Sequence, residues 1–177
     1  LFEEIILSKN SFYSPLALNV LLEKSLESDH NKIMDHFKIV ESMDSLPPIM
    51  IGHNRRFSQH TKKMRNWLQT RSTPLVVQMR VNCGFVSSSH WVHSHEEGRS
   101  RIVGEMSHFI DLLQCLTDSL VTRVYAERIS GDNKSSVNND NVVIVMKFSD
   151  GSIGNLTYSA SGNRSYSREA LEIFFDA

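Results

Sequence analysis

Apolar residues recur at three- and four-residue steps through Arg101–Leu116, a spacing that places them on one face of a helix. These apolar positions are Ile102, Met106, Phe109, Ile110, Leu113 and Leu116. Glu105, His108 and Asp111 lie three residues apart, so their side chains follow one flank of the expected helix. A carboxylate beside an imidazole can keep a histidine as a proton acceptor near neutral pH. A surface helix with a polar flank is the alternative, and the spacing alone leaves both interpretations open.

The first part of the chain predicts short strands alternating with helices. Val20–Leu22 is apolar and β-leaning, and Ile49–Ile51 is a short apolar run that ends at a glycine. Between them we expect a helix that starts near Ser28 and is stopped by Pro47-Pro48, because proline excludes helical neighbours.

A second helix is expected from Ser58, which can cap it, to about Gln69. Its inward-facing residues should be Met64, Trp67 and Leu68.

After Pro74 the pattern changes to period two, which is typical of a strand with one buried face. The apolar positions of this run are Leu75, Val77, Met79, Val81 and Cys83. Further strands are expected at Val121–Ile129 and Leu171–Phe175.

The clearest local signal is a hairpin, in which Asp150-Gly151 joins the β-rich runs Asn141–Ser149 and Ser152–Ser161. Because glycine readily takes a positive φ, this pair predicts a type I′ turn. Strands joined by a hairpin and by long excursions, with helices before and between them, predict an α+β fold. We expect a mainly antiparallel, open-faced sheet with helices on one face.

Both faces of the run from 141 to 149 are largely apolar. One face carries Val142, Ile144 and Met146, and the other carries Val143, Val145 and Lys147. Since an exposed apolar surface usually marks an interface, we expect a homo-oligomer that forms through the open sheet face.

Composition narrows the class of protein. The 177 residues are 40% hydrophobic and 22% charged, with a formal net charge of −1, so no basic excess indicates a nucleic-acid partner. No apolar run approaches the length of a membrane span, and no leader-like segment opens the chain. Cys83 and Cys115 do not make a disulfide framework, and they fit a reducing compartment. We therefore expect a soluble, cytoplasmic protein.

Two short clusters could carry chemistry. Glu23-Lys24-Ser25 follows an apolar strand, where a lysine can point into a cleft, although a solvated lysine is the ordinary alternative. In the segment from Gly52 to Phe57, Asn54 and Arg56 could bind a polyhydroxylated ligand or a carboxylate. A capped helix with surface arginines would explain the second cluster equally well.

A histidine-rich loop contains His90, His93 and His95 around Trp91. This spacing matches no familiar zinc signature, so we expect no metal site. The sequence also lacks the glycine-rich loops G-x-G-x-x-G and G-x-x-x-x-G-K-[ST].

Taken in order, these clusters resemble motifs of the glucose–fructose oxidoreductase / inositol dehydrogenase (Gfo/Idh/MocA-like) family. Val20–Glu27 (V-L-L-E-K-S-L-E) resembles the strand that ends in E-K-P in that family, and Gly52–Gln59 (G-H-N-R-R-F-S-Q) resembles G-F-N-R-R-F-S-P. Trp91–Asp111 resembles a tryptophan-containing loop that leads into D-x-G-x-H-x-x-D. The resemblance covers about Val20 to Phe175.

The resemblance implies two parts. Residues 1–52 would be a remnant of a nucleotide-binding domain, a partial Rossmann α/β segment. Residues 53–177 would be the C-terminal α/β substrate and assembly domain, truncated at its end. The whole protein would be an NAD- or NADP-dependent dehydrogenase that acts on a sugar, a sugar derivative or a cyclitol by hydride transfer.

The resemblance also assigns roles to residues. Lys24 and His108 would be catalytic, with His108 as the general base and Glu105 orienting it. Glu23 and Lys24 would lie at the cofactor. The substrate would be bound by Asn54, Arg56 and Trp91.

Three departures from the family pattern keep a second hypothesis open. Ser25 replaces a proline, Arg99-Ser100 replace glycines, and the glycine-rich dinucleotide fingerprint is missing. The alternative is therefore a non-catalytic binding or oligomerisation module derived from the family. We expect the 177-residue chain alone to bind nicotinamide weakly or not at all, and so to be inactive.

Overall fold

The computed structural model describes residues 20–22, 30–42, 49–94, 101–130 and 140–176. The chain divides into two units, Leu1–His53 and Asn54–Ala177. In the first unit, strands β1 (Val20–Leu22) and β2 (Ile49–Ile51) pair in parallel, and helix α2 (His30–Glu41) lies between them in sequence. The expected order of strand, helix and strand is confirmed. Parallel neighbours need such a crossover connection.

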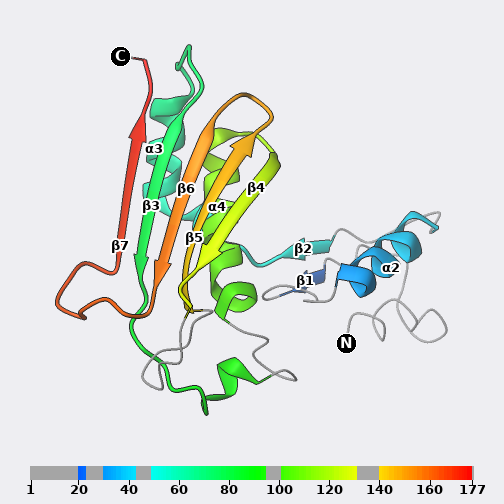
Figure 1. The fold of residues 1–177 in the computed structure, drawn as a ribbon. Helices are drawn as coiled ribbons and strands as arrows, with labels where there is room; N and C mark the ends of the chain where they lie inside the picture. Colours follow the sequence, from blue (N-terminus) through cyan, green and yellow to red (C-terminus); the bar gives the residue numbers. More distant parts are fainter. Residues whose placement is uncertain (1–19, 23–29, 43–48, 95–100, 131–139, 177) are drawn as a thin grey trace. The chain divides into compact units, whose positions relative to one another are not determined.

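The second unit is built on a five-stranded sheet of order β4-β5-β6-β3-β7 (Figure 1). Its strands are β3 (Val76–Asn82), β4 (Val121–Arg128), β5 (Asn141–Phe148), β6 (Ile153–Ser159) and β7 (Glu169–Phe174). The pairs β4–β5, β5–β6 and β3–β7 are antiparallel, and β3–β6 is parallel. The α+β class is confirmed, and the sheet is mixed rather than strictly antiparallel.

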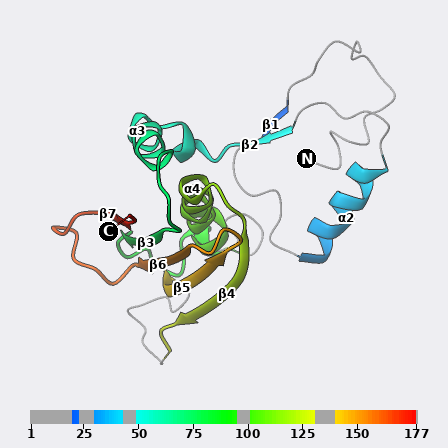
Figure 2. The ribbon, with the colours of Figure 1, turned by 90° about the horizontal axis from the view of Figure 1, so that it is seen from above.

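Helices α3 (Gln59–Leu68) and α4 (Ser107–Thr117) cover one face of this sheet (Figure 2). Alternate residues of β3, β5 and β6 point toward them, as the period-two patterns predict. The most buried members of this core are Val77, Val81, Leu113, Leu156, Tyr158 and Met106. One buried layer between helices and sheet is the usual way for such elements to hide their apolar faces.

The start of α3 is as predicted, but its buried face is not. Ser58 caps the helix, since its Oγ accepts a hydrogen bond from the backbone N–H of Thr61 at 3.1 Å. The face toward the sheet carries Thr61, Met64 and Leu68, whereas the Trp67 side chain is 60% exposed. The predicted inward position of Trp67 is therefore wrong. At 100° per residue Trp67 lies on the flank of the helix, and a threonine, Thr61, occupies the inward position two turns before Leu68.

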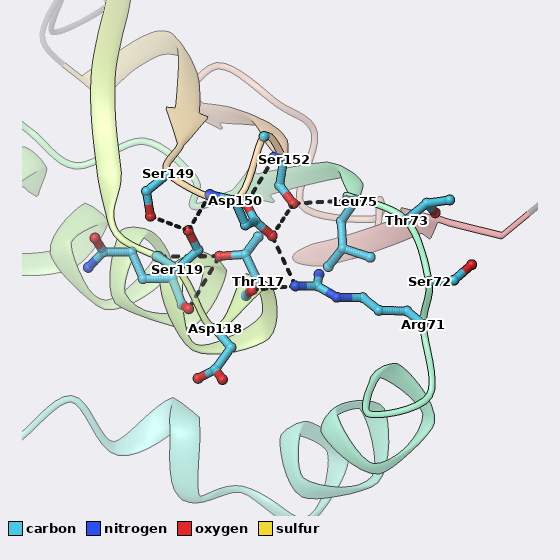
Figure 3. Close-up of polar contacts among 12 residues, drawn as sticks. Arg71, Ser72, Thr73, Leu75, Thr117, Asp118, Ser119, Ser149, Asp150 and Ser152 are labelled. Atoms are coloured by element: carbon cyan, nitrogen blue, oxygen red, sulfur yellow. Dashed lines mark hydrogen bonds and ion pairs between the residues drawn. The ribbon is translucent and has the colours of Figure 1, made fainter.

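The predicted hairpin joins β5 and β6, but its turn is not of type I′. That type needs a positive φ at two consecutive residues, and here Gly151 has φ +94° while Asp150 does not share it. Ser152 donates to the Asp150 carboxylate from its N–H (2.9 Å) and its hydroxyl (2.8 Å). Arg71 donates to the same carboxylate at 2.9 Å, as Figure 3 shows. The Asp150 carboxylate therefore holds the turn through hydrogen bonds from Ser152 and Arg71.

Strand β3 lies between partners that come much later in the chain. Val76 pairs with Ile153 of β6 on one side and with Phe174 of β7 on the other. Just after β7, the Asp176 carboxylate accepts hydrogen bonds from the backbone N–H groups of Ser72 and Thr73, both at 2.9 Å. The segment that leads into β3 and the segment that follows β7 are thus fastened together at the sheet edge.

The sheet face away from the helices is open and partly apolar. Its exposed side chains include Tyr125, Val143, Val145 and Ile153, with exposed fractions between 42% and 65%. Among the described residues, no helix has both the length and the apolar content that crossing a bilayer requires.

Candidate active site

The helix predicted over Arg101–Leu116 is confirmed, with an unusual first turn. Ile102–Met106 forms a π-helical turn, η3, and α4 continues from Ser107 to Thr117. π-Helical turns are rare in proteins. Those that do occur are often found at functional sites. His108 is the second residue of α4 and is half-buried.

Glu105 is held one turn before His108 by two buried partners. Arg101 donates to it from Nε (3.0 Å) and Nη2 (3.1 Å), and the Tyr158 hydroxyl donates at 2.6 Å. Each hydrogen bond that the Glu105 carboxylate makes among the described residues goes to one of these two. Arg101 is itself anchored by a 2.8 Å bond from Nη1 to the backbone carbonyl of Gly84. Glu105 therefore links η3 to β6 through its hydrogen bond with Tyr158.

Burial and hydrogen bonding act against each other on the Glu105 carboxyl. Burial works to raise its pKa, but the bonds from Arg101 and Tyr158 together hold that pKa below its ordinary value. Burial and the bond to Glu105 both raise the pKa of Tyr158. Glu105 is accordingly ionised and Tyr158 neutral at physiological pH.

Asp140 extends this cluster toward the loop that contains Trp91. Its carboxylate is buried, with Oδ2 lying 3.5 Å from His93 Nε2 and 3.7 Å from Arg101 Nη1. Burial raises the pKa of Asp140, and electrostatic interactions with the nearby His93 and Arg101 side chains reduce that rise. His93 belongs to η2 (Trp91–His93), so this contact places the short turn beside the start of β5.

The arginines that follow Asn54 pack onto α4. Arg56 donates to both carboxylate oxygens of Asp111, through Nε at 2.9 Å and through Nη2. Arg55 donates to both oxygens of Glu169 (2.6 and 2.9 Å), and its guanidinium lies 4.2 Å from the centre of the Phe109 ring. Both arginines belong to η1 (Asn54–Phe57), so their contacts hold η1 against the helix that carries His108.

The remaining predicted site residues are spread over several elements. Asn54 opens η1 and is exposed, and Trp91 is 53% exposed in η2. Glu23 and Lys24 lie outside the described residues, as does His95 of the histidine-rich loop. His90 uses Nδ1 to accept a bond from the Val92 N–H, which caps η2. Within the described part of the chain, no group of three histidine, cysteine, aspartate or glutamate residues is placed to hold a metal ion.

The family model of the GFO/IDH/MocA C-terminal domain matches residues 62–177. The chain belongs to the GFO/IDH/MocA family. This match covers more than half of the sequence and includes η3, α4 and the whole sheet. His108, Glu105 and Asp111 therefore lie inside the family's domain.

Solved structures of several oxidoreductases have a similar fold at low sequence identity. The oxidoreductase domain protein from Kribbella flavida has a TM-score of 0.73 at 14% identity, over 89% of this chain and 48% of its own. The WlbA dehydrogenase from Bordetella pertussis, in complex with NADH and UDP-GlcNAcA, has a TM-score of 0.71 at 15% identity, over 89% and 50%. The myo-inositol dehydrogenase from Lactobacillus casei, in complex with NAD(H) and myo-inositol, has a TM-score of 0.67 at 17% identity, over 88% and 44%.

The chain spans about half the length of these structures. No curated protein matches the sequence.

Several residues of the site went unnoticed in the sequence. Arg101 stands four residues before Glu105, a spacing that joins opposite charges on a helix and could have revealed the pair. Tyr158 and Asp140 carry no such local signal, because their partners are brought to them by the sheet.

Proposed function

We propose that this chain is part of an NAD- or NADP-dependent oxidoreductase acting on a sugar, a sugar derivative or a cyclitol. The observation that carries the proposal is the family match together with His108 on the first turn of α4, within the matched domain. Two relatives of the same fold are described in complex with NAD(H) and a sugar-like ligand, which supports this substrate class. We also propose that the whole protein is soluble and cytoplasmic.

His108 is proposed to act as the general base. It would take the proton of the substrate hydroxyl as that carbon is oxidised, and return it in the reverse direction. Glu105 is already held by Arg101 and Tyr158, so its contribution would be to fix η3, and through it the position of His108. Asn54, Arg56 and Trp91 are the proposed substrate-binding residues, and Lys24 the proposed second catalytic group.

The nicotinamide cofactor would accept the hydride when bound. The 177 residues contain no G-x-G-x-x-G loop, and Glu23 and Lys24 lie outside the described residues. The described residues therefore do not supply a dinucleotide cradle. We propose that residues 1–52 are the end of a nucleotide-binding domain, with residues 53–177 as the substrate and assembly domain.

Steady-state kinetics of the whole protein with His108→Ala tests the base assignment. Loss of a positioned general base typically lowers turnover about 10²–10⁴-fold. We expect kcat to fall by that order while the far-ultraviolet spectrum and the melting temperature stay unchanged. Unchanged turnover on the sugar substrate would refute the role of His108.

A non-catalytic module is the second candidate, and the missing glycine-rich loop favours it for the 177-residue chain. Titrating this chain with NAD(H) and NADP(H) by calorimetry tests the module hypothesis. Tight binding of either dinucleotide contradicts the module reading.

We also propose that two copies pair through the open sheet face. The exposed apolar residues on β4, β5 and β6 support such an interface.

A further inference from the structure

A buried acid, Asp140, lies just before β5 and has no part in the proposed chemistry. Its side chain is 1% exposed. Its backbone carbonyl oxygen accepts a 3.0 Å hydrogen bond from the Ala160 N–H, which ties the residue to the end of β6. The end of β3 and the start of β5 lie at the same end of the sheet (Figure 1). Asp140 is therefore a fixed point of the sheet beside the segment that follows β3.

The Asp140 carboxylate is buried without a hydrogen bond. Among the described residues, no donor bonds either of its oxygens, and the same is true of the buried Nε2 of His93, 3.5 Å away. Arg101 also lies near, but it directs its hydrogen bonds to Glu105 and to the backbone carbonyls of Cys83 and Gly84. Buried polar atoms without partners are destabilising, so this pair requires a physical explanation.

The charges in this cluster balance when His93 and Asp140 hold one additional proton between them. Arg101 and Glu105 form an ion pair and cancel each other. An ionised Asp140 beside a neutral His93 would then leave one uncompensated negative charge in a buried place, which is strongly unfavourable. A proton shared between imidazole and carboxylate removes that charge and lets Nε2 donate to the carboxylate.

The other titratable groups around the pair do not change this balance. Burial raises the pKa of Cys83, at the end of β3, and that of Tyr158 on β6, so both are neutral at physiological pH. Arg168 acts on Glu105 from the segment before β7, but it is exposed and therefore screened by solvent.

The proton matters because His93 belongs to the three-residue turn η2, which also carries Trp91. The Trp91 ring is 53% exposed, so burial in the core does not fix it. The His93 side chain, in contrast, is only 10% exposed and reaches the fixed Asp140. Attraction between these two buried groups therefore sets where the turn lies against the sheet.

We propose that Asp140 and His93 are positioning residues for Trp91, and that the proton they share keeps η2 against the start of β5. The inference rests on the proposed function in assigning Trp91 to the substrate. Loss of the proton as the pH rises leaves a buried negative charge and releases η2. Substrate binding then weakens, while the chemistry at His108 is unchanged.

Acrylamide quenching of Trp91 fluorescence in the 177-residue chain tests the coupling without any substrate. Trp67→Phe removes the second of the two tryptophans, which is exposed on α3, so that Trp91 alone is observed. The quenching constant should rise between about pH 6 and about pH 9, by at most about twofold because the ring is already 53% exposed. In the same background, His93→Gln and Asp140→Asn should show the high quenching constant at every pH, because neither pair can share the proton.

Two histidine variants serve as controls. His60→Gln removes an exposed histidine on α3 and should leave the pH profile unchanged. His90→Asn is needed because the His90 ring lies 5.5 Å from the Trp91 ring and can quench it directly, while asparagine keeps an oxygen that can cap η2. A pH profile that persists in His93→Gln, or that disappears in His90→Asn, overturns the proposal.

The melting temperature separates a released turn from an unfolded chain. Asp140→Asn should not lower it, because burial opposes the charge of this carboxyl. Higher quenching at an undiminished melting temperature supports the positioning role. Quenching that stays at the low level in both His93→Gln and Asp140→Asn overturns it.

Steady-state kinetics of the whole protein test the consequence for the substrate. His93→Gln should raise KM about tenfold and change kcat by less than about twofold, since the lost contact positions the ground state and the transition state alike. A fall in kcat at unchanged KM overturns the positioning role. The expected quenching profile in a protein without dehydrogenase activity refutes the proposed function and leaves the coupling intact. A flat profile in an active dehydrogenase overturns the coupling alone.

Discussion

Arg56 and Asp111 form a bidentate ion pair that joins η1 to α4 across 55 residues of chain. Asp111 lies one helical turn after His108, and its side chain is 11% exposed while that of Arg56 is 40% exposed. The pair therefore fixes the flank of the helix that carries the proposed base. Together with the contacts of Arg55 to Glu169 and Phe109, this ion pair holds η1 against α4 and β7.

Arg56→Ala should destabilise the second unit, because it leaves the nearly buried Asp111 carboxylate without its charged donor. The cost of such an unpaired group is about 1–3 kcal/mol. Urea denaturation followed by tryptophan fluorescence measures it. Lys38→Ala, which removes one partner of the exposed pair with Asp35, should change stability by less than about 0.5 kcal/mol. Equal effects of the two substitutions would contradict a stabilising role for the Arg56–Asp111 ion pair.

The two carboxylates around Arg101 should give opposite pH dependences. The pKa of Glu105 is lowered from its ordinary 4.5, so its stabilising contribution is present above pH 4.5 and is lost as the pH falls through the folded-state pKa. The pKa of Asp140 is raised from 3.8, so its charge destabilises the folded chain as the pH rises through the folded-state pKa.

Accordingly, Glu105→Gln should lower the melting temperature at pH 7, with a smaller loss in acid. Asp140→Asn should raise it at pH 7, and this gain should vanish below pH 3.8, where both states bind the proton. Melting curves of the two variants across the acid range measure both effects. A gain for Asp140→Asn that grows on acidification would refute the assigned sign.

The open sheet face gives a prediction about assembly. Val145 is 43% exposed at the middle of β5, so Val145→Glu places a charge in the proposed interface and should convert dimers to monomers. Sedimentation velocity at micromolar concentration is the measurement. Trp67→Glu is the control, because Trp67 is 60% exposed on the helical layer and should leave the assembly unchanged. A wild-type chain that sediments only as a monomer would dispose of the interface.

Local patterns predicted the elements well, because each depends on neighbouring residues. The alternation after Pro74 identified β3, and Ser58 identified the start of α3. The inward face of α3 was predicted partly wrongly, since hydrophobicity alone favoured Trp67 over Thr61. The hydroxyl of Thr61 is satisfied by the Arg55 carbonyl oxygen at 2.8 Å, which makes its burial inexpensive.

Contacts between distant segments could not be read from the sequence. Nothing near Arg56 indicates that Asp111 is its partner, and nothing near Glu105 indicates Tyr158, because the fold alone brings these side chains together. The parallel pairing of β3 with β6 escaped prediction for the same reason. The register of a hairpin is set by its turn, which is visible in the local sequence. The register of a parallel pair depends on the whole connection between its strands.

The position of β3 has a kinetic consequence. Strands β4, β5 and β6 pair in sequence order and can zip together through short-range contacts, but both partners of β3 come from beyond residue 152. Closing such long loops costs entropy before any contact repays it, so folding should be limited by the docking of β3. Until then both edges of an apolar strand stand open, and a chain emerging from the ribosome is most prone to aggregate through this strand.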